Sequence, residues 1–252
     1  QCGSVQTELA QALLESLADH QHELGGHAPP HAGMPLAKQV LSQFRWLEHI
    51  EDGSALLGTL GQMIQVAEPA LRRELVLVLP DVVVDGQHAE AVELLAELLR
   101  EDSQFTAPIL ESLSSLHLER EKEEEVCQLV TASVASARTA DLPAIIRFLL
   151  HMLTKENAAD VTAALRAGLS SELLASSSQT EPAGEALVLD ALLSSLRLSP
   201  GVGGLFLTQL EAIKRAADHR PIDWWLLTAL SSAGDAKCRA RTQRLLAERA
   251  AK

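Results

Sequence analysis

Stripes of leucine and other aliphatic residues at helical spacing recur along the chain about every 15 to 20 residues. A representative stripe is Leu56, Leu57, Leu60 and Ile64, in which residues three and four apart fall on one side of a helix. Short breakers such as Glu51-Asp52-Gly53 separate one stripe from the next. Short helices joined by loops of a few residues pack against their chain neighbours, so the spacing predicts stacked antiparallel helix pairs.

The composition favours an all-helical fold. Aromatic residues are 3% of the chain and Tyr is absent, so few residues favour strands, while Leu and Ala favour helices. Hydrophobic residues make up 47% of the 252 residues, which suffices for a sizeable core. We therefore predict an all-α fold, an α-solenoid of the HEAT or armadillo type over residues 1–169 and again over 186–252. The Ser-rich stretch 170–185 is expected to be a flexible linker.

Individual residues set the expected helix ends. We expect Ser54 to cap the helix that follows it and Pro69 to open the next, which reaches Pro80. The β-branched run 75–84 leaves a strand open as an alternative, although no second strand is evident to pair with it. Gly201 to Gly204 are expected to form a turn. The helix after them carries an apolar face of Phe206, Leu210, Ile213 and Ala217.

The charge of the chain limits its partners. A net charge of −13 excludes a bulk attraction to nucleic acid or anionic lipid, so any such contact must be local. Three distant cysteines, Cys2, Cys127 and Cys238, build no disulfide framework and indicate a reducing compartment. No apolar run approaches the ~18 residues of a membrane span, so we expect no membrane partner. Because the chain starts at Gln1 and not Met, we expect both ends to be fragment ends.

The C-terminal segment offers one such local contact. Residues 237–252 hold six basic residues and one acidic residue in an otherwise acidic chain. Lys237, Arg241 and Arg244 fall at i, i+4 and i+7 on one face of a helix, which suits a row of DNA phosphates. The alternative is a solvated basic face in which Glu248 pairs with Arg244.

Catalytic chemistry finds no support in the sequence. There is no G-x-S-x-G, P-loop or G-x-G-x-x-G pattern, so we expect no enzyme and no cofactor. His20, His22, His27 and His31 cluster, but neighbouring positions such as 20 and 22 point to different faces of a helix, so we expect no metal site. The acidic run 119–125 is expected to begin a helix, where the dipole favours negative charge.

Four stretches of sequence resemble the Fanconi anaemia group D2 protein family, in that family's order and roughly its spacing. They are QFRWLEHIEDG (43–53), LPDVVVDGQHAE (79–90), PILESLSSLHL (108–118) and DLPAIIRFLLH (141–151). The resemblance is to the N-terminal half of the family's members, and none of these stretches is a catalytic motif.

The resemblance implies a nuclear, non-enzymatic α-solenoid in the repair of DNA interstrand crosslinks. It implies pairing with the Fanconi anaemia group I protein and enclosure of duplex DNA by the pair. It also implies that a dedicated ligase and conjugating enzyme attach one ubiquitin to a single lysine.

Lys214 is the candidate ubiquitin acceptor. The family's acceptor is expected on a helix in the region matching Phe206 to Ala217, and an ungapped match of Ala212-Ile213 puts Glu211 at the acceptor position. A one-residue gap in the alignment with the family puts Lys214 at the acceptor position instead. Lys214 is then expected one helical turn from Glu211. The other interpretation of Lys214 is a solvated lysine flanking an apolar stripe.

Ser-Gln pairs occur at Ser42, Ser103 and Ser178. Damage-response kinases favour this dipeptide, and only Ser178 lies in the expected flexible stretch, so it is the phosphorylation candidate. The leading hypothesis is therefore a DNA-repair scaffold that other enzymes modify. The alternative is a generic helical-repeat adaptor that binds peptides or partner proteins on a concave face.

Overall fold

The computed structural model describes residues 2–19, 36–46, 52–169 and 184–250. These residues form thirteen α-helices and five short 3-10 helices, and no described residue belongs to a strand. The all-α helical-repeat prediction is confirmed. The alternative strand over 75–84 is wrong, because residues 75–82 lie in a helix.

The chain forms two compact units, residues 1–122 and 123–252. The helices of the first unit are α1 (Cys2–Asp19), α3 (Leu36–Gln43), α4 (Gly53–Val66), α5 (Pro69–Val82), α6 (His88–Glu101) and α7 (Thr106–Ser115). Its 3-10 helices are η1 (Phe44–Trp46), η2 (Asp85–Gln87) and η3 (Ser103–Phe105). Helix α8 (Arg120–Ser133) starts with the predicted acidic run and continues into the second unit.

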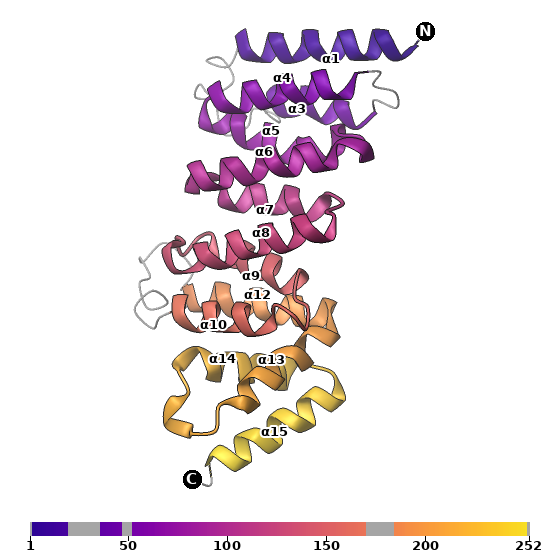
Figure 1. Cartoon of the computed structure of the whole chain (residues 1–252). Coiled ribbons are helices and arrows are strands. Elements are labelled where there is room, and N and C mark those ends of the chain that lie inside the picture. Colours follow the sequence, from indigo (N-terminus) through magenta and orange to yellow (C-terminus); the bar gives the residue numbers. More distant parts are fainter. Residues whose placement is uncertain (1, 20–35, 47–51, 170–183, 251–252) are drawn as a thin grey trace. The chain divides into compact units, whose positions relative to one another are not determined.

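Helices of the first unit pack on their chain neighbours and on the next helix but one. Helix α5 contacts α4 and α6 and also lies beside α3 and α7, as Figure 1 shows. The leucine stripes supply the core between these layers. Leu60, Leu75, Leu95, Ile109 and Leu113 are fully buried. Burying such side chains contributes about 1.5 to 3 kcal/mol each, so the predicted stripes are what hold the stack together.

Two helix starts test the predicted caps. The first residue of α5 is Pro69, as predicted, a position where its missing N–H costs nothing. The cap of α4 is Asp52 and not Ser54, because the Asp52 carboxylate accepts a hydrogen bond from the Ala55 N–H at 2.9 Å. The helix therefore begins at Gly53, two residues earlier than a cap at Ser54 allows.

Helix α5 continues through Pro80 to Val82, two residues beyond its predicted end. A proline has no N–H, so Pro80 leaves the carbonyl of Val76, four residues earlier, without its helical donor. The buried hydroxyl of Ser112 in α7 donates to that carbonyl at 2.6 Å. A side chain of the neighbouring helix thus satisfies the carbonyl that proline leaves free and joins α5 to α7.

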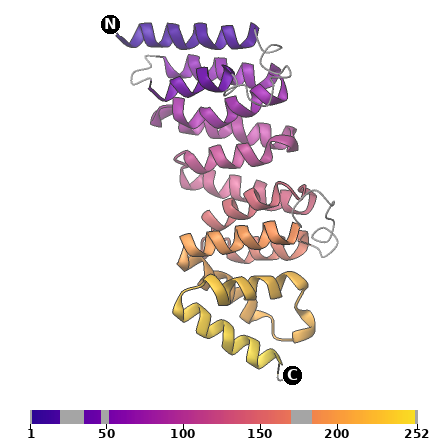
Figure 2. The ribbon, with the colours of Figure 1, turned by 180° about the vertical axis from the view of Figure 1, so that it is seen from behind.

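The second unit contains η4 (Val134–Ser136), α9 (Leu142–His151), α10 (Ala158–Gly168), α12 (Gly184–Leu198), α13 (Pro200–Ala212), η5 (Ala216–Asp218), α14 (Pro221–Ala233) and α15 (Ala236–Ala250). Helix α12 packs against both α9 and α14, as the view from behind in Figure 2 shows. Of the linker predicted over 170–185, residues 170–183 lie outside the described residues, and Gly184 already begins α12.

The turn predicted at Gly201 to Gly204 is wrong, because these residues form the first turns of α13. A Cβ built on Gly203 would lie 3.1 Å from a methyl of Leu230 in α14 and 3.3 Å from the Cys238 sulfur in α15. The absent side chain therefore lets α13 approach its neighbours closely, which is a packing role and not a turn.

No single described helix is long and apolar enough to cross a membrane. The bent pair Ala186–Leu198 and Gly201–Ala212 meets the length and composition criteria only when its two helices are taken together.

Candidate functional site

The predicted basic row lies on α15, where Lys237 is exposed and both arginines have carboxylate partners. Arg241 donates to both oxygens of Glu211 in α13, from Nε at 3.2 Å and from Nη2 at 2.5 Å. Hydrogen bonds to Glu211 hold the pKa of Arg241 above its ordinary value. Arg244 donates to Glu248 at 3.0 Å, the pair that the solvated-face alternative expected. The role of the row in DNA contact stays a prediction.

The last arginine of α15 holds the chain that follows α13. Helix α13 ends at Ala212, and Ile213 has extended backbone, with φ −75° and ψ 101°. The Arg249 guanidinium donates from Nη2 to the carbonyl of Ile213 and from Nη1 to that of Lys214. Another helical turn would use these two carbonyls as acceptors. Arg249 therefore stabilises the end of α13 where a cation also interacts favourably with the helix dipole.

Lys214 consequently lies in the segment between α13 and η5, not on a helix. The helical setting expected for it, one turn beyond Glu211, is wrong because the helix ends first. The apolar face predicted over 206–217 is interrupted at the same point. The Lys214 side chain is exposed to solvent, with its carbonyl held by Arg249. Its role as acceptor stays a prediction, and Glu211 belongs to the ion pair with Arg241.

A buried ionic network anchors the other end of this segment. Asp223 in α14 is fully buried, and its carboxylate accepts from Arg166 Nε in α10 at 2.8 Å and from Arg166 Nη2 at 3.1 Å. The Arg220 N–H donates to the same carboxylate at 2.9 Å, and His219 Nδ1 lies 3.3 Å away. Arg166 also donates to the Asp218 carbonyl. These partners offset the cost of burying the Asp223 carboxylate. The network therefore fixes residues 218–223 against α10.

The sequence alone did not identify this network. Asp223 and Arg166 are 57 residues apart, so no local spacing relates them. The available signal was local, since Asp223 lies in the first turn of α14, three residues after Arg220, where a carboxylate reaches back to the backbone.

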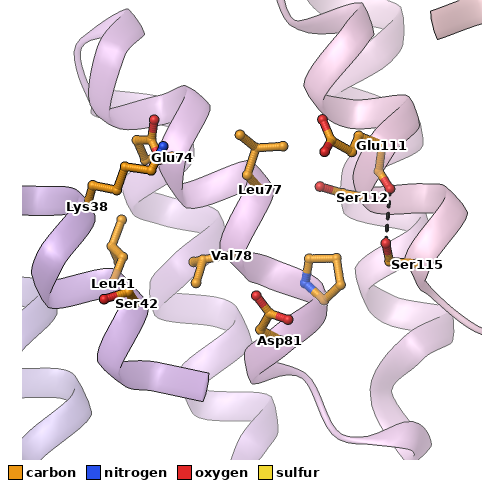
Figure 3. Close-up of a pocket in the computed structure, with 11 residues that line it drawn as sticks. Lys38, Leu41, Ser42, Glu74, Leu77, Val78, Asp81, Glu111, Ser112 and Ser115 are labelled. Atoms are coloured by element: carbon orange, nitrogen blue, oxygen red, sulfur yellow. Dashed lines mark hydrogen bonds and ion pairs between the residues drawn. The ribbon is translucent and has the colours of Figure 1, made fainter. Parts of the chain in front are cut away.

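In the first unit, a groove with a volume of about 370 Å³ crosses α3, α5 and α7 (Figure 3). Its apolar surface comes from Leu41, Leu77, Val78 and Pro80, and four charged residues line it: Lys38, Glu74, Asp81 and Glu111. Volumes of this size are at the lower end of the range of about 300 to 1,000 Å³ for ligand sites. The groove therefore accommodates a few side chains.

Metal-ligating and nucleophilic groups do not gather in the part of the chain that the structure describes. No three His, Cys, Asp or Glu residues there could hold a metal ion. Burial raises the pKa of the Cys127 and Cys238 thiols, which makes them poor nucleophiles. The histidine cluster at 20–31 and the phosphorylation candidate Ser178 lie outside the described residues.

The stacked helices of the described residues define an α-helical repeat protein. A family model described as "Fanconi anaemia protein FancD2 nuclease" matches residues 2–252. The chain therefore belongs to the Fanconi anaemia group D2 family, and the resemblance in the four stretches is confirmed.

Named relatives agree with this assignment. The Fanconi anemia group D2 protein homolog of Mus musculus is 31% identical over 222 residues, which cover 79% of this chain and 15% of the mouse protein. The Fanconi anemia group D2 protein of Gallus gallus is 27% identical over 236 residues, or 85% of this chain and 16% of the chicken protein. This chain thus corresponds to a small part of its relatives' length. Their names state no catalytic activity, whereas the family description contains the word nuclease.

Proposed function

We propose that this chain is a non-catalytic scaffold segment that acts in the nucleus, in the Fanconi anaemia pathway of interstrand-crosslink repair. Membership of the group D2 family over residues 2–252 is the observation that carries the proposal. The helical-repeat fold supports it, since stacked helices build long surfaces for partner proteins. In this proposal the chain contributes to pairing with the Fanconi anaemia group I protein and to enclosing duplex DNA.

Two surface elements of the second unit serve this function. Lys237 and Arg244, both exposed on α15, contact DNA phosphates, with Arg244 exchanging Glu248 for phosphate. Arg241 contributes less because Glu211 already neutralises it. Lys214 accepts one ubiquitin from the ligase and conjugating enzyme of the pathway, its side chain being exposed on a segment held at both ends.

Reconstitution of the full-length protein with the group I protein, duplex DNA, ubiquitin and both enzymes tests this proposal. Mass spectrometry locates the modified lysine. Lys214→Arg keeps the charge but forms no isopeptide bond, so it abolishes modification if Lys214 is the acceptor. Lys155→Arg, another exposed lysine of the second unit, is the matched control. If the Lys214→Arg protein is modified at the wild-type level, the acceptor is another residue. The scaffold proposal is then tested by pairing with the group I protein.

Two other functions give different results in the same preparation. A generic peptide-binding adaptor, which the groove across α3, α5 and α7 favours, binds short peptides but not the group I protein. A nuclease, the word in the family description, cuts DNA in the presence of Mg²⁺ or Mn²⁺. We expect pairing with the group I protein and no cleavage by this chain.

A further inference from the structure

We propose that the groove across α3, α5 and α7 is a docking site for a partner-protein segment that carries basic side chains next to an aliphatic one. The site is separate from the surfaces of α13–α15 invoked above. The residues that line the groove fall between Lys38 and Ser115, within the first unit.

The shape of the groove is fixed by the helix pairing that surrounds Pro80. The Ser112 hydroxyl donates a hydrogen bond to the Val76 carbonyl and so joins α7 to α5 at the groove. Both Pro80 and Ser112 line the groove. Val78 is buried, while Leu77 remains half-buried beside it. Figure 3 shows Leu77 between Glu74 on one side and Glu111 on the other. An aliphatic side chain entering here covers apolar surface that water now contacts.

The charged residues around the groove favour an occupant with positive charge. Three carboxylates and one ammonium line it, and Lys38 is only 3.8 Å from Glu74, with half of its side chain exposed. Exposed ion pairs of this kind contribute about 0 to 1 kcal/mol, so Lys38 neutralises one carboxylate weakly. The carboxylate of Glu111 is exposed and has no ion-pair partner among the described residues. An arginine or lysine is therefore favoured, since its stem lies on the apolar surface while its head reaches Glu111.

Methyl NMR of the whole chain, labelled at Leu and Val, tests the site with a defined probe. The probe is the acetylated and amidated peptide Leu-Arg-Lys-Leu-Leu-Arg. Its counterpart has Glu at the three basic positions, and a third peptide has Ser at the three Leu positions. We expect the basic peptide to shift the methyl resonances of Leu77 and Val78 saturably, and both other peptides to bind at least about 5-fold more weakly.

Charge reversal at the groove provides the decisive comparison. Glu111→Lys is expected to weaken binding of the basic peptide about 5-fold. Glu97→Lys makes the same charge change on α6 at an exposed residue that does not line the groove, and is expected to leave binding unchanged.

Three results would overturn the proposal. One is the absence of shifts at Leu77 and Val78, and another is equal binding of the acidic and basic peptides. The third is movement of these resonances with chain concentration alone, which would show a second copy of the chain as the occupant. None of them bears on pairing with the group I protein, because that pairing is measured without the peptides.

Discussion

Polar side chains join neighbouring helices in both units, but the burial of the charged groups among them differs. In the first unit, a neutral hydroxyl links α5 and α7, from Ser112 to the Val76 carbonyl, and the carboxylates around it remain at the surface. In the second unit, ionised groups make the links, from Arg166 to Asp223 and from Arg241 to Glu211. The first unit also contains the ion pair of Arg72 with Asp102, but 20% and 30% of these side chains are exposed, whereas Asp223 is fully buried. The buried charge of the second unit therefore contributes to packing, while the exposed charge of the groove contacts a partner in our proposal.

Loss of the buried carboxylate gives the largest expected effect. Asp223→Ala leaves Arg166 without its ion-pair partner and is expected to lower the free energy of unfolding by about 3 to 5 kcal/mol. Urea unfolding followed by circular dichroism measures this. Asp218→Ala, an exposed acid nearby whose carbonyl and not its carboxylate binds Arg166, is expected to change stability by less than about 0.5 kcal/mol. Equal effects of the two substitutions would contradict a packing role for charge in this unit.

Removal of the hydroxyl beneath the groove comes next. Ser112→Ala leaves the Val76 carbonyl without a donor and is expected to cost about 1 to 3 kcal/mol of stability. The matched control is Ser115→Ala on the same helix, since Ser115 is exposed and bonds only within α7. A change below about 0.5 kcal/mol for Ser112→Ala would show that the carbonyl of Val76 finds another partner.

Arg249→Ala tests the tie between α15 and the end of α13. Its loss frees the carbonyls of Ile213 and Lys214, with an expected cost of about 1 to 2 kcal/mol. Hydrogen exchange of residues 213–218 should quicken more than exchange elsewhere in the second unit. Arg239→Ala, an exposed arginine on the same helix, serves as the control. Unchanged exchange of this segment in Arg249→Ala would rule out the tie.

Charge reversal at the groove gives the smallest effect on stability. Glu111→Lys is expected to change the free energy of unfolding by less than about 0.5 kcal/mol, because the residue is exposed. The same substitution is expected to weaken binding of the basic peptide. A loss of stability above about 1 kcal/mol would give Glu111 a packing role and remove the difference between the units.

Sequence patterns predicted the helices well where one apolar face determines the structure. The stripe at Leu56–Ile64 and the proline at 69 each identified a helix that the structure contains. The patterns failed where a distant side chain changes the local outcome. Proline at 80 does not end α5, since Ser112 satisfies the freed carbonyl. Residues 201–204 belong to α13, where Gly203 lies close to side chains of α14 and α15.

The candidate site residues were predicted less completely, because their partners lie far along the chain. The spacing of Lys237, Arg241 and Arg244 correctly placed them on one helix, and the pairing of Arg244 with Glu248 followed from local spacing. The partner of Arg241 is 30 residues away, and the carbonyls bound by Arg249 are 35 and 36 residues away. No local pattern contains such contacts, so the end of α13 before Lys214 was not foreseen.

The proposal that this chain is a non-catalytic pairing segment is tested most directly by hydrogen exchange of the full-length protein. Mass spectrometry compares the free protein with its complex with the group I protein, at concentrations where the complex is saturated. We expect slower exchange for exposed peptides within residues 2–252 in the complex, and no DNA cleavage by the same sample. Identical exchange of every peptide in this range, with and without the group I protein, would contradict it.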